Sequence, residues 1–266
     1  ADCAVMVIDA AKGVEAQTIK LFKVCTLRHI PIFTFVNKMD REARDPFELM
    51  ENIEEILGIK TYPMNWPISC GKDFKGVYDR NAKRVLAFES DGRANGVKMV
   101  DEIEAELGDP ALDTLIGAAN HQKLADDIEL LDGAAEEFDL AAVQHGELSP
   151  VFFGSALTNF GVEPFLKEFL RLTPTPLPRK DSVSGELVDP CSEQFSGFVF
   201  KIQANMNKNH RDRIAFLRIC SGKFERGMEA FHVQEGKNIK LATGTSLMAD
   251  DRAIVSEAYA GDIIGL

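Results

Sequence analysis

The sequence has few cysteines, no long apolar run and no glycine-rich phosphate loop. No stretch of about 18 consecutive apolar residues occurs, which excludes a conventional membrane-spanning helix within these 266 residues. The five cysteines are scattered singly and form no Cys-x-x-Cys pair, so neither a zinc site nor a disulfide framework is indicated. The histidines show no ligand spacing either, and we predict no metal site in the chain. Reduced thiols and the lack of a basic-then-apolar leader favour a cytoplasmic protein.

Basic residues are scarce in one block, which accounts for the whole net negative charge of the chain. The whole chain has a formal net charge of −12. Residues 101–147 hold 14 acidic side chains and one basic side chain, a net of −13, so the other 219 residues sum to +1. We therefore expect the acidic block to face a basic protein surface, while contact of the remaining chain with RNA is not excluded.

Three apolar runs have the length and composition of buried strands. The first two, 4–8 and 31–36, are separated by a helical pattern at about 14–29. The third, 151–153, is followed by an amphipathic stretch at about 162–172. Strand and helix alternating at this spacing predict an α/β fold with a parallel sheet, of the type found in P-loop GTPases but incomplete.

An α+β insertion is predicted at about 59–147. More than 100 residues separate the second apolar run from the third, whereas a simple crossover unit needs about 30. A helix comes first, with Asp45 as N-cap, Pro46 at its first position and Gly58 at its end. The elements expected after it are three strand-like pieces and two acidic helices, at 62–69, 76–78, 84–88, 111–118 and 121–143.

Alternating prolines at 173–178 predict an extended linker. Short strand candidates separated by turn signals follow it and predict a small antiparallel β-barrel. The strand candidates are 195–202, 214–221, 229–233 and 239–241. The predicted organisation is therefore a domain at 1–172, a linker at 173–194 and a barrel at 195–266.

Asn37-Lys38-Met39-Asp40 follows the second predicted strand directly. Ligands of open parallel sheets bind beyond the carboxyl ends of the strands. The Asp40 carboxylate can accept hydrogen bonds from the ring N–H and the exocyclic amine of guanine, which adenine cannot supply there. The Lys38 stem can lie over the base, and the Asn37 amide can bond the base or tie loops together. The alternative is a polar turn without a ligand.

Gly154-Ser155-Ala156-Leu157 follows the third predicted strand, so it should lie at the same sheet edge. Small residues let the backbone approach a flat ring, and the Ala156 N–H can donate to the guanine carbonyl oxygen. The alternative is a plain strand-to-helix turn capped by Ser155. Together, the two motifs predict a pocket for the base of GTP or GDP.

The phosphate-binding pattern Gly-x-x-x-x-Gly-Lys-Ser/Thr does not occur in the chain. That loop is what cradles nucleotide phosphates. We therefore expect no catalytic residue and no magnesium ligand here, and we expect the chain alone to be inactive as a GTPase. A locally basic stretch, 205–226, can lie along RNA phosphates, although a solvated hairpin explains it equally well.

Longer stretches resemble the translational GTPases over essentially the whole chain. Residues 2–18 are similar to the segment after the second phosphate-sensing loop of that family. Other stretches are similar to its termination branch rather than to elongation factor G. They are 37–46, 66–78, 150–162, 198–206, 210–218 and 258–266.

The resemblance implies a translation termination GTPase that binds the ribosome and promotes departure of class I release factors. It assigns base binding to Asn37, Lys38, Asp40, Ser155, Ala156 and Leu157. It implies that the Mg²⁺ ligands, the phosphate-binding part, the end of the barrel and a C-terminal domain lie outside these residues. The insertion would dock on a ribosomal stalk protein and the barrel on ribosomal RNA. An elongation factor G-like GTPase and a non-catalytic ribosome-binding fragment remain as alternatives.

Overall fold

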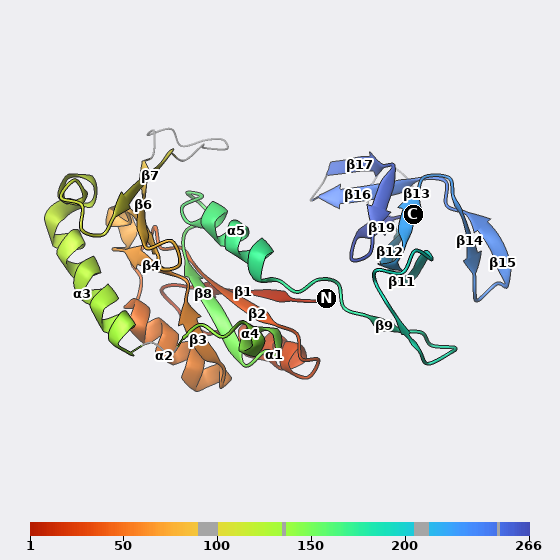
Figure 1. The fold of residues 1–266 in the computed structure, drawn as a ribbon, viewed down its shortest axis with the longest axis horizontal. Helices are drawn as coiled ribbons and strands as arrows, with labels where there is room; N and C mark the ends of the chain where they lie inside the picture. Colours follow the sequence, from red (N-terminus) through yellow and green to blue (C-terminus); the bar gives the residue numbers. More distant parts are fainter. Residues whose placement is uncertain (90–100, 135–136, 205–212, 249–250) are drawn as a thin grey trace. The chain divides into compact units, whose positions relative to one another are not determined.

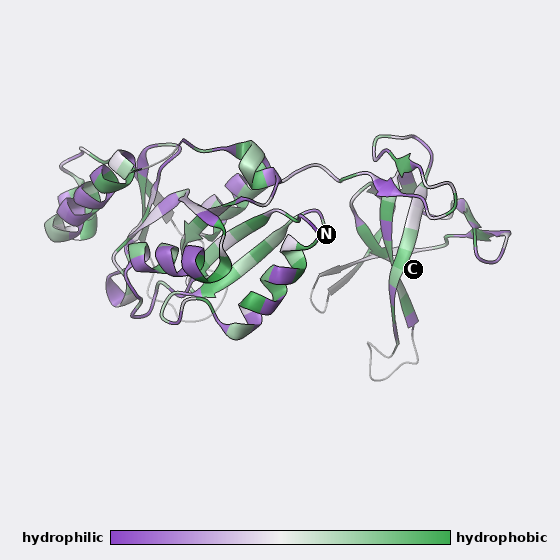
Figure 2. Cartoon of the chain, turned by 90° about the horizontal axis from the view of Figure 1, so that it is seen from below, coloured by the Kyte–Doolittle hydropathy of each residue, from purple (hydrophilic) through white to green (hydrophobic). Residues whose placement is uncertain are grey.

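The computed structural model describes residues 1–89, 101–134, 137–204, 213–248 and 251–266. They form two compact units, Ala1–Pro174 and Thr175–Leu266 (Figure 1). None of the described helices is both long enough and apolar enough to cross a bilayer. Figure 2 shows apolar colour running along the strands of the central sheet, whereas the helices alternate between apolar and polar colour.

A four-stranded parallel sheet forms the centre of the first unit. Its order is β1-β2-β8-β3, and each pairing between neighbours is parallel. The predicted parallel α/β sheet is therefore confirmed. Its strands are β1 (Ala4–Asp9), β2 (Ile32–Asn37), β3 (Lys60–Pro63) and β8 (Leu148–Phe153).

Helix α5 (Val162–Leu172) covers one face of this sheet with aromatic side chains. Phe165 lies 5.1 Å from Phe35 and 5.0 Å from Phe152 between ring centroids. Phe169 meets Phe33 edge-on at 5.0 Å. Because side chains alternate across a strand, Phe33 and Phe35 of β2 share this face and its core cluster.

The opposite face of the sheet is covered by α2 (Pro46–Leu57) and belongs to a second core cluster. Leu49 and Ile53 are its fully buried residues. The predicted cap is confirmed, since the Asp45 side chain accepts a hydrogen bond from Phe47 N at 2.9 Å. Gly58 ends the helix in the left-handed conformation. Two further helices complete this part of the unit, α1 (Ala16–Thr26) and α4 (Leu140–Gln144).

A second, antiparallel sheet and an acidic helix lie between β3 and α4 in the chain. The sheet runs in the order β4-β5-β6-β7. Its strands and the helical elements beside it are β4 (Asn65–Ile68), η1 (Gly71–Asp73), β5 (Gly76–Asp79), β6 (Arg84–Glu89), β7 (Asp101–Glu106), a π-helical turn η2 (Asp113–Gly117) and α3 (Ala118–Ala134). Trp66 is fully buried beneath α3, and its Nε1 donates to Asp127 Oδ2 at 3.0 Å.

Two predictions for this region were wrong in detail, and one strand was missed. The piece at 62–69 is two strands in two different sheets, because Pro63 closes the pairing with β8 and the chain changes sheet at Met64. The acidic stretch of β7 was not predicted as a strand, although its Ile103 and Ala105 alternate with the exposed Glu104 and Glu106. The two acidic helices divide elsewhere, at 113–134 and at α4.

The second unit is built from antiparallel pairs, as predicted. A five-stranded sheet has the order β11-β12-β19-β16-β17, and three two-stranded pairs accompany it. Its core includes Ile219, Phe224 and Ile264. The strands of this unit are β9 (Arg179–Lys180), β10 (Leu187–Val188), β11 (Ser196–Ala204), β12 (Arg213–Ser221), β13 (Lys223–Glu225), β14 (Glu229–His232), β15 (Lys237–Lys240), β16 (Gly244–Met248), β17 (Asp251–Val255), β18 (Glu257–Tyr259) and β19 (Ile263–Gly265).

Candidate nucleotide-base site

The two loops singled out in the sequence begin at neighbouring strand ends. Val36 near the end of β2 pairs in parallel register with Phe153 at the end of β8. Gly154 N donates to Val36 O at 3.0 Å, and Met39 N donates back to Gly154 O at 3.1 Å. The structure therefore brings the segments around Asp40 and Ser155 together at the carboxyl edge of the sheet, where ligands of this fold class bind.

Asp40 is held by the second loop. Ser155 Oγ donates to Asp40 Oδ1 at 2.5 Å, and Ser155 is fully buried. Thr158 N donates to the same hydroxyl oxygen at 3.3 Å, which orients the Ser155 proton toward the carboxylate. A carboxylate with one oxygen fixed in this way presents its remaining acceptor positions in a defined direction, as bidentate recognition of a base edge requires.

Asn37 ties the two loops together through its side-chain oxygen. Asn37 Oδ1 accepts from Lys38 N at 2.8 Å and from Ala156 N at 2.9 Å. The Ala156 N–H that the sequence suggested for the guanine carbonyl is thus donated to Asn37 here. Contact between Ala156 and a base requires this hydrogen to be shared or released.

Lys38 stands in an unusual backbone conformation and forms an ion pair with the neighbouring strand. Its φ is 71°, in the left-handed region that few non-glycine residues occupy. Its Nζ lies 2.7 Å from Asp9 Oδ2. The hydrogen bond from Lys38 holds the pKa of the Asp9 carboxyl below its usual value, and backbone N–H groups of Ala11 and Lys12 add to that lowering against the effect of desolvation.

Asp9 is the site residue that sequence reasoning missed. It ends β1 and pairs in register with Asn37, so its carboxylate lies at the same sheet edge as the predicted motif. The available signal was an acidic residue at the carboxyl end of a predicted neighbouring strand.

The second loop depends on glycine for its path. Ser155 N donates to Phe160 O at 2.9 Å and closes the loop back on itself. A Cβ at Gly154 would lie 2.6 Å from Phe160 O, and Gly161 has a φ of 74°. Leu157, at the tip, is 77% exposed. The loop therefore presents backbone atoms and the exposed Leu157 side chain to solvent, where a flat ring could lie against them.

Met39 anchors the loop that carries Asn37 and Asp40. Its side chain is almost fully buried, with 1% exposed. Its carbonyl oxygen accepts from Gly71 N at 2.8 Å, and Gly71 begins the short η1 turn between β4 and β5. The loop that carries Asp40 is thus hydrogen bonded to the loop after β8 and to the turn between β4 and β5.

The described residues at this sheet edge do not form a metal site. Within the described part of the chain, no cluster of three or more His, Cys, Asp or Glu side chains could hold a metal ion. The residues present do not fit a Mg²⁺ site, and no chemical step follows from them.

The basic stretch predicted at 205–226 lies partly outside the described residues, which omit 205–212. In its described part, Arg218 is only 8% exposed. Lys223 Nζ pairs with Glu225 at 2.9 Å and with Glu257 at 2.7 Å. The exposed cationic surface there is therefore smaller than the sequence suggested.

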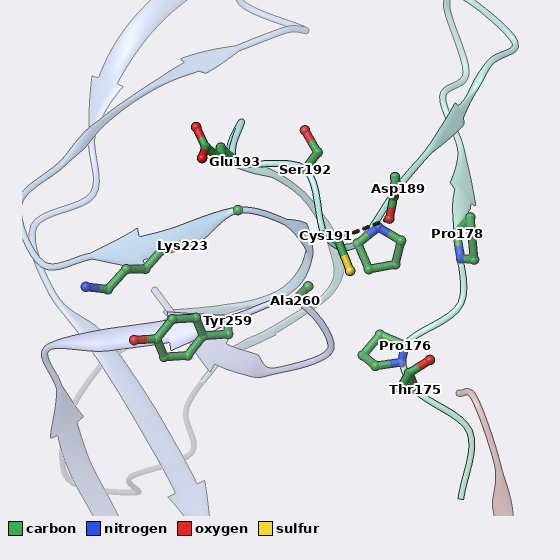
Figure 3. A pocket seen from close by; sticks show the side chains of 12 residues that line it. Thr175, Pro176, Pro178, Asp189, Cys191, Ser192, Glu193, Lys223, Tyr259 and Ala260 are labelled. Atoms are coloured by element: carbon green, nitrogen blue, oxygen red, sulfur yellow. Dashed lines mark hydrogen bonds between the residues drawn. The ribbon is translucent and has the colours of Figure 1, made fainter.

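A separate hollow of about 700 Å³ lies within the second unit (Figure 3). Prolines of the 173–178 stretch and the ring of Tyr259 line it, and Lys223 Nζ lies 5.9 Å from the centroid of that ring. Its lining shows no set of converging polar groups that would identify a ligand.

Comparison with known proteins gives matches along the entire chain. Residues 1–175 match the elongation factor Tu GTP binding domain, and residues 194–266 match elongation factor G domain 2. Two curated relatives carry the name peptide chain release factor 3. The chain is 57% identical to the one from Symbiobacterium thermophilum and 53% identical to the one from Synechocystis sp., with all of this chain covered. It spans about half the length of these relatives, 50% and 48% respectively.

A crystal structure of a protein from Thermus thermophilus has the same fold. It matches the whole chain with a TM-score of 0.69 at 24% identity, and the match covers 38% of that structure. At this identity the likeness supports the arrangement of a parallel sheet followed by an antiparallel domain.

Proposed function

The chain belongs to the translational GTPases, as a member of the elongation factor Tu GTP-binding-domain family with relatives named peptide chain release factor 3, and on that premise we propose that it reads the guanine base of GTP and GDP within a translation termination factor. The observation that carries the proposal is the fixed carboxylate of Asp40, held by Ser155 at the sheet edge. Asn37 and Lys38, with the loop backbone of Ala156 and Leu157, supply the remaining contacts.

Guanine fits this arrangement because it presents two adjacent donors to one carboxylate. Asp40 would accept from the ring N–H and the exocyclic amine, while the Lys38 stem covers the ring. Adenine would leave Asp40 facing an acceptor, and a site of this kind discriminates by roughly 10⁴-fold. Inosine nucleotides keep the ring N–H but lack the amine, so they should fall between the two.

Competition for a fluorescent GDP analogue in the full-length parent tests the base assignment. GTP and GDP should compete best, inosine nucleotides about ten- to a hundredfold less well, and ATP not measurably. Equal competition by inosine and guanine nucleotides would remove the amine contact from the proposal. Equal competition by ATP would remove guanine reading altogether.

The wider function proposed for the parent is GTP hydrolysis on the ribosome, in the cytoplasm, with release of class I release factors. GTP and GDP states would differ in their affinity for the ribosome, so that hydrolysis shifts the population between them. Mg²⁺ would be bound by residues of the parent beyond those of this chain. Purified 266-residue chain should show no ribosome-stimulated hydrolysis, whereas the full-length parent should; turnover by the chain alone would contradict this.

The acidic surface of the insertion is proposed to dock on a basic protein, such as a protein of the ribosomal stalk. Exposed acidic side chains stand along β7 and α3, among them Glu106, Asp126 and Glu129. Like charges gathered on one face accelerate association with a basic partner and do so most at low salt. The antiparallel domain would face ribosomal RNA.

A charge-neutralised variant tests this docking surface. Neutralising Glu106, Asp126, Glu129 and Glu137 together should slow association of the parent with ribosomes several-fold at low ionic strength and little at high ionic strength. The matched control neutralises four exposed glutamates elsewhere, Glu51, Glu55, Glu186 and Glu193. An association rate that responds equally to both sets would count against a localised surface.

A further inference from the structure

Asp9 makes two sets of contacts, one from each carboxylate oxygen. Oδ1 accepts from Ala11 N at 2.9 Å and from Lys12 N at 3.3 Å, which caps the turn after β1. Oδ2 accepts from Lys38 Nζ at 2.7 Å. The first set anchors the carboxylate to its own strand end, so that it is a fixed partner when Lys38 reaches it.

The Lys38 side chain is therefore held at its backbone end and at its ammonium group. At the backbone, Lys38 N donates to Asn37 Oδ1 at 2.8 Å and Lys38 O accepts from Arg41 N at 3.1 Å, which supports its left-handed conformation. At the tip, the side chain of Asp9 is only 12% exposed, against 47% for Lys38. A pair with one partner so largely removed from water is less screened than a fully exposed pair.

We infer that Asp9 is a positioning residue of the base site, which holds the aliphatic stem of Lys38 in place as a cover for the purine ring. The inference rests on the proposed base-reading function. A free lysine stem has four rotatable bonds, and ordering it only when the nucleotide arrives would weaken binding. The ion pair with Asp9 orders the stem before the nucleotide arrives, so the loss of side-chain entropy no longer weakens binding.

This role predicts an effect on affinity but not on base selectivity. The stem contacts the ring face, which all purines share, whereas Asp40 contacts the edge that distinguishes guanine. In the full-length parent, Asp9→Asn should therefore raise the Kd for GDP and for inosine diphosphate by the same factor, about three- to tenfold. The Asn side-chain oxygen can still cap the turn at Ala11, so the substitution mainly removes the charge facing Lys38.

A double-mutant cycle separates positioning from a merely structural role. Asp9→Asn should have no further effect on GDP affinity in a Lys38→Ala background, because Asp9 acts through Lys38. Asp9→Glu should restore part of the affinity, since it keeps the charge. Equal losses from Asp9→Asn in both backgrounds, or no loss in the Lys38-containing protein, would overturn the inference.

The control and the fallback variant keep the outcome interpretable. Asp181 of the second unit caps a similar turn, accepting from Val183 N and Ser184 N at 2.6 and 2.8 Å. Asp181→Asn should leave GDP affinity unchanged. If Asp9→Asn does not fold, Asp9→Ser, which removes the charge and keeps a side-chain oxygen for the turn, takes its place in the cycle with Lys38→Ala. Absence of guanine preference in the wild-type parent would refute the base-reading proposal. If the wild-type parent prefers guanine and Asp9→Asn binds GDP with wild-type affinity, only the role of Asp9 is refuted.

Discussion

The hydroxyl of Ser155 and the carboxylate of Asp40 are joined by a 2.5 Å hydrogen bond across 115 residues of sequence. Each residue follows a different strand of the parallel sheet, and the whole insertion lies between them in the chain. The orientation of the Asp40 carboxylate therefore depends on a loop that lies far away in the sequence.

Ser155→Ala should weaken GDP binding by about tenfold or more in the full-length parent. The substitution removes a hydrogen bond to a charged acceptor, and such bonds contribute about 1.5–3 kcal/mol. Titration with a fluorescent GDP analogue measures it. Ser192→Ala is the matched control, because Ser192 Oγ accepts a local hydrogen bond from Gln194 N in the second unit. An unchanged Kd for Ser155→Ala would show that Asp40 needs no help in holding its orientation.

Asp40→Asn should shift preference from guanine to xanthine nucleotides. Xanthine has a carbonyl where guanine has its amine, so it can accept from the new side-chain amide. Competition between GDP and xanthosine diphosphate measures the change, which should reach a hundredfold or more in the ratio of affinities, on the order of 3 kcal/mol. Asp45→Asn, which preserves the cap of α2, should leave the ratio alone. Retained guanine selectivity in Asp40→Asn would sink the base-reader assignment.

His121 should make the insertion more stable at acidic than at alkaline pH. Its Nδ1 lies 2.7 Å from Asp113 Oδ1 and its Nε2 lies 2.7 Å from Leu107 O, and only the cation can donate to both. The Asp113 hydrogen bond, followed by the Leu107 carbonyl, raises the pKa of His121 above 6.5. A group whose pKa is raised by folding stabilises the folded state fully at pH values below its unfolded-state pKa. This stabilisation is lost as the pH rises through the folded-state pKa.

Thermal unfolding at about pH 6 and about pH 9 measures this dependence. His121→Gln should flatten the difference between the two conditions, and the exposed His145→Gln should not. A wild-type profile that the His121 substitution leaves intact would assign the pH dependence to other groups.

Leu124→Ala should destabilise the first unit far more than Leu130→Ala. Both belong to α3, but Leu124 is 2% exposed and Leu130 is 63% exposed. Emptying a packed leucine site costs about 2–5 kcal/mol, whereas an exposed truncation stays within about 0.5 kcal/mol. Urea unfolding followed by the fluorescence of the single tryptophan, Trp66, reports on this core directly. Similar midpoints for the two variants would contradict the packing of α3 on the antiparallel sheet.

The elements with strong periodicity were predictable from sequence. The buried strands β1, β2 and β8 and the capped helix α2 carry their own local signals, and the base-site motifs lie at the strand ends where parallel-sheet geometry places them. The strand β7 was not predictable in this way, because its charged residues conceal a two-residue alternation. The change of sheet at Met64 depends on pairing between distant strands, which no local pattern encodes.

The contacts within the site were less predictable than its location. The proximity of Asp40 and Ser155 followed from strand order, but the use of Ala156 N by Asn37 did not. Lys38 gave no sequence sign of its left-handed backbone, since glycine and asparagine are the residues that usually mark that conformation. Asp9 became visible only through the register of β1 with β2.

The backbone of Met39 is hydrogen bonded on one side to Gly154 and on the other to Gly71. A single peptide segment thus links the loop that carries Asp40 to the turn between β4 and β5. A displacement of the antiparallel sheet would therefore be transmitted to the segment that carries Asp40 through the backbone hydrogen bonds of Gly71.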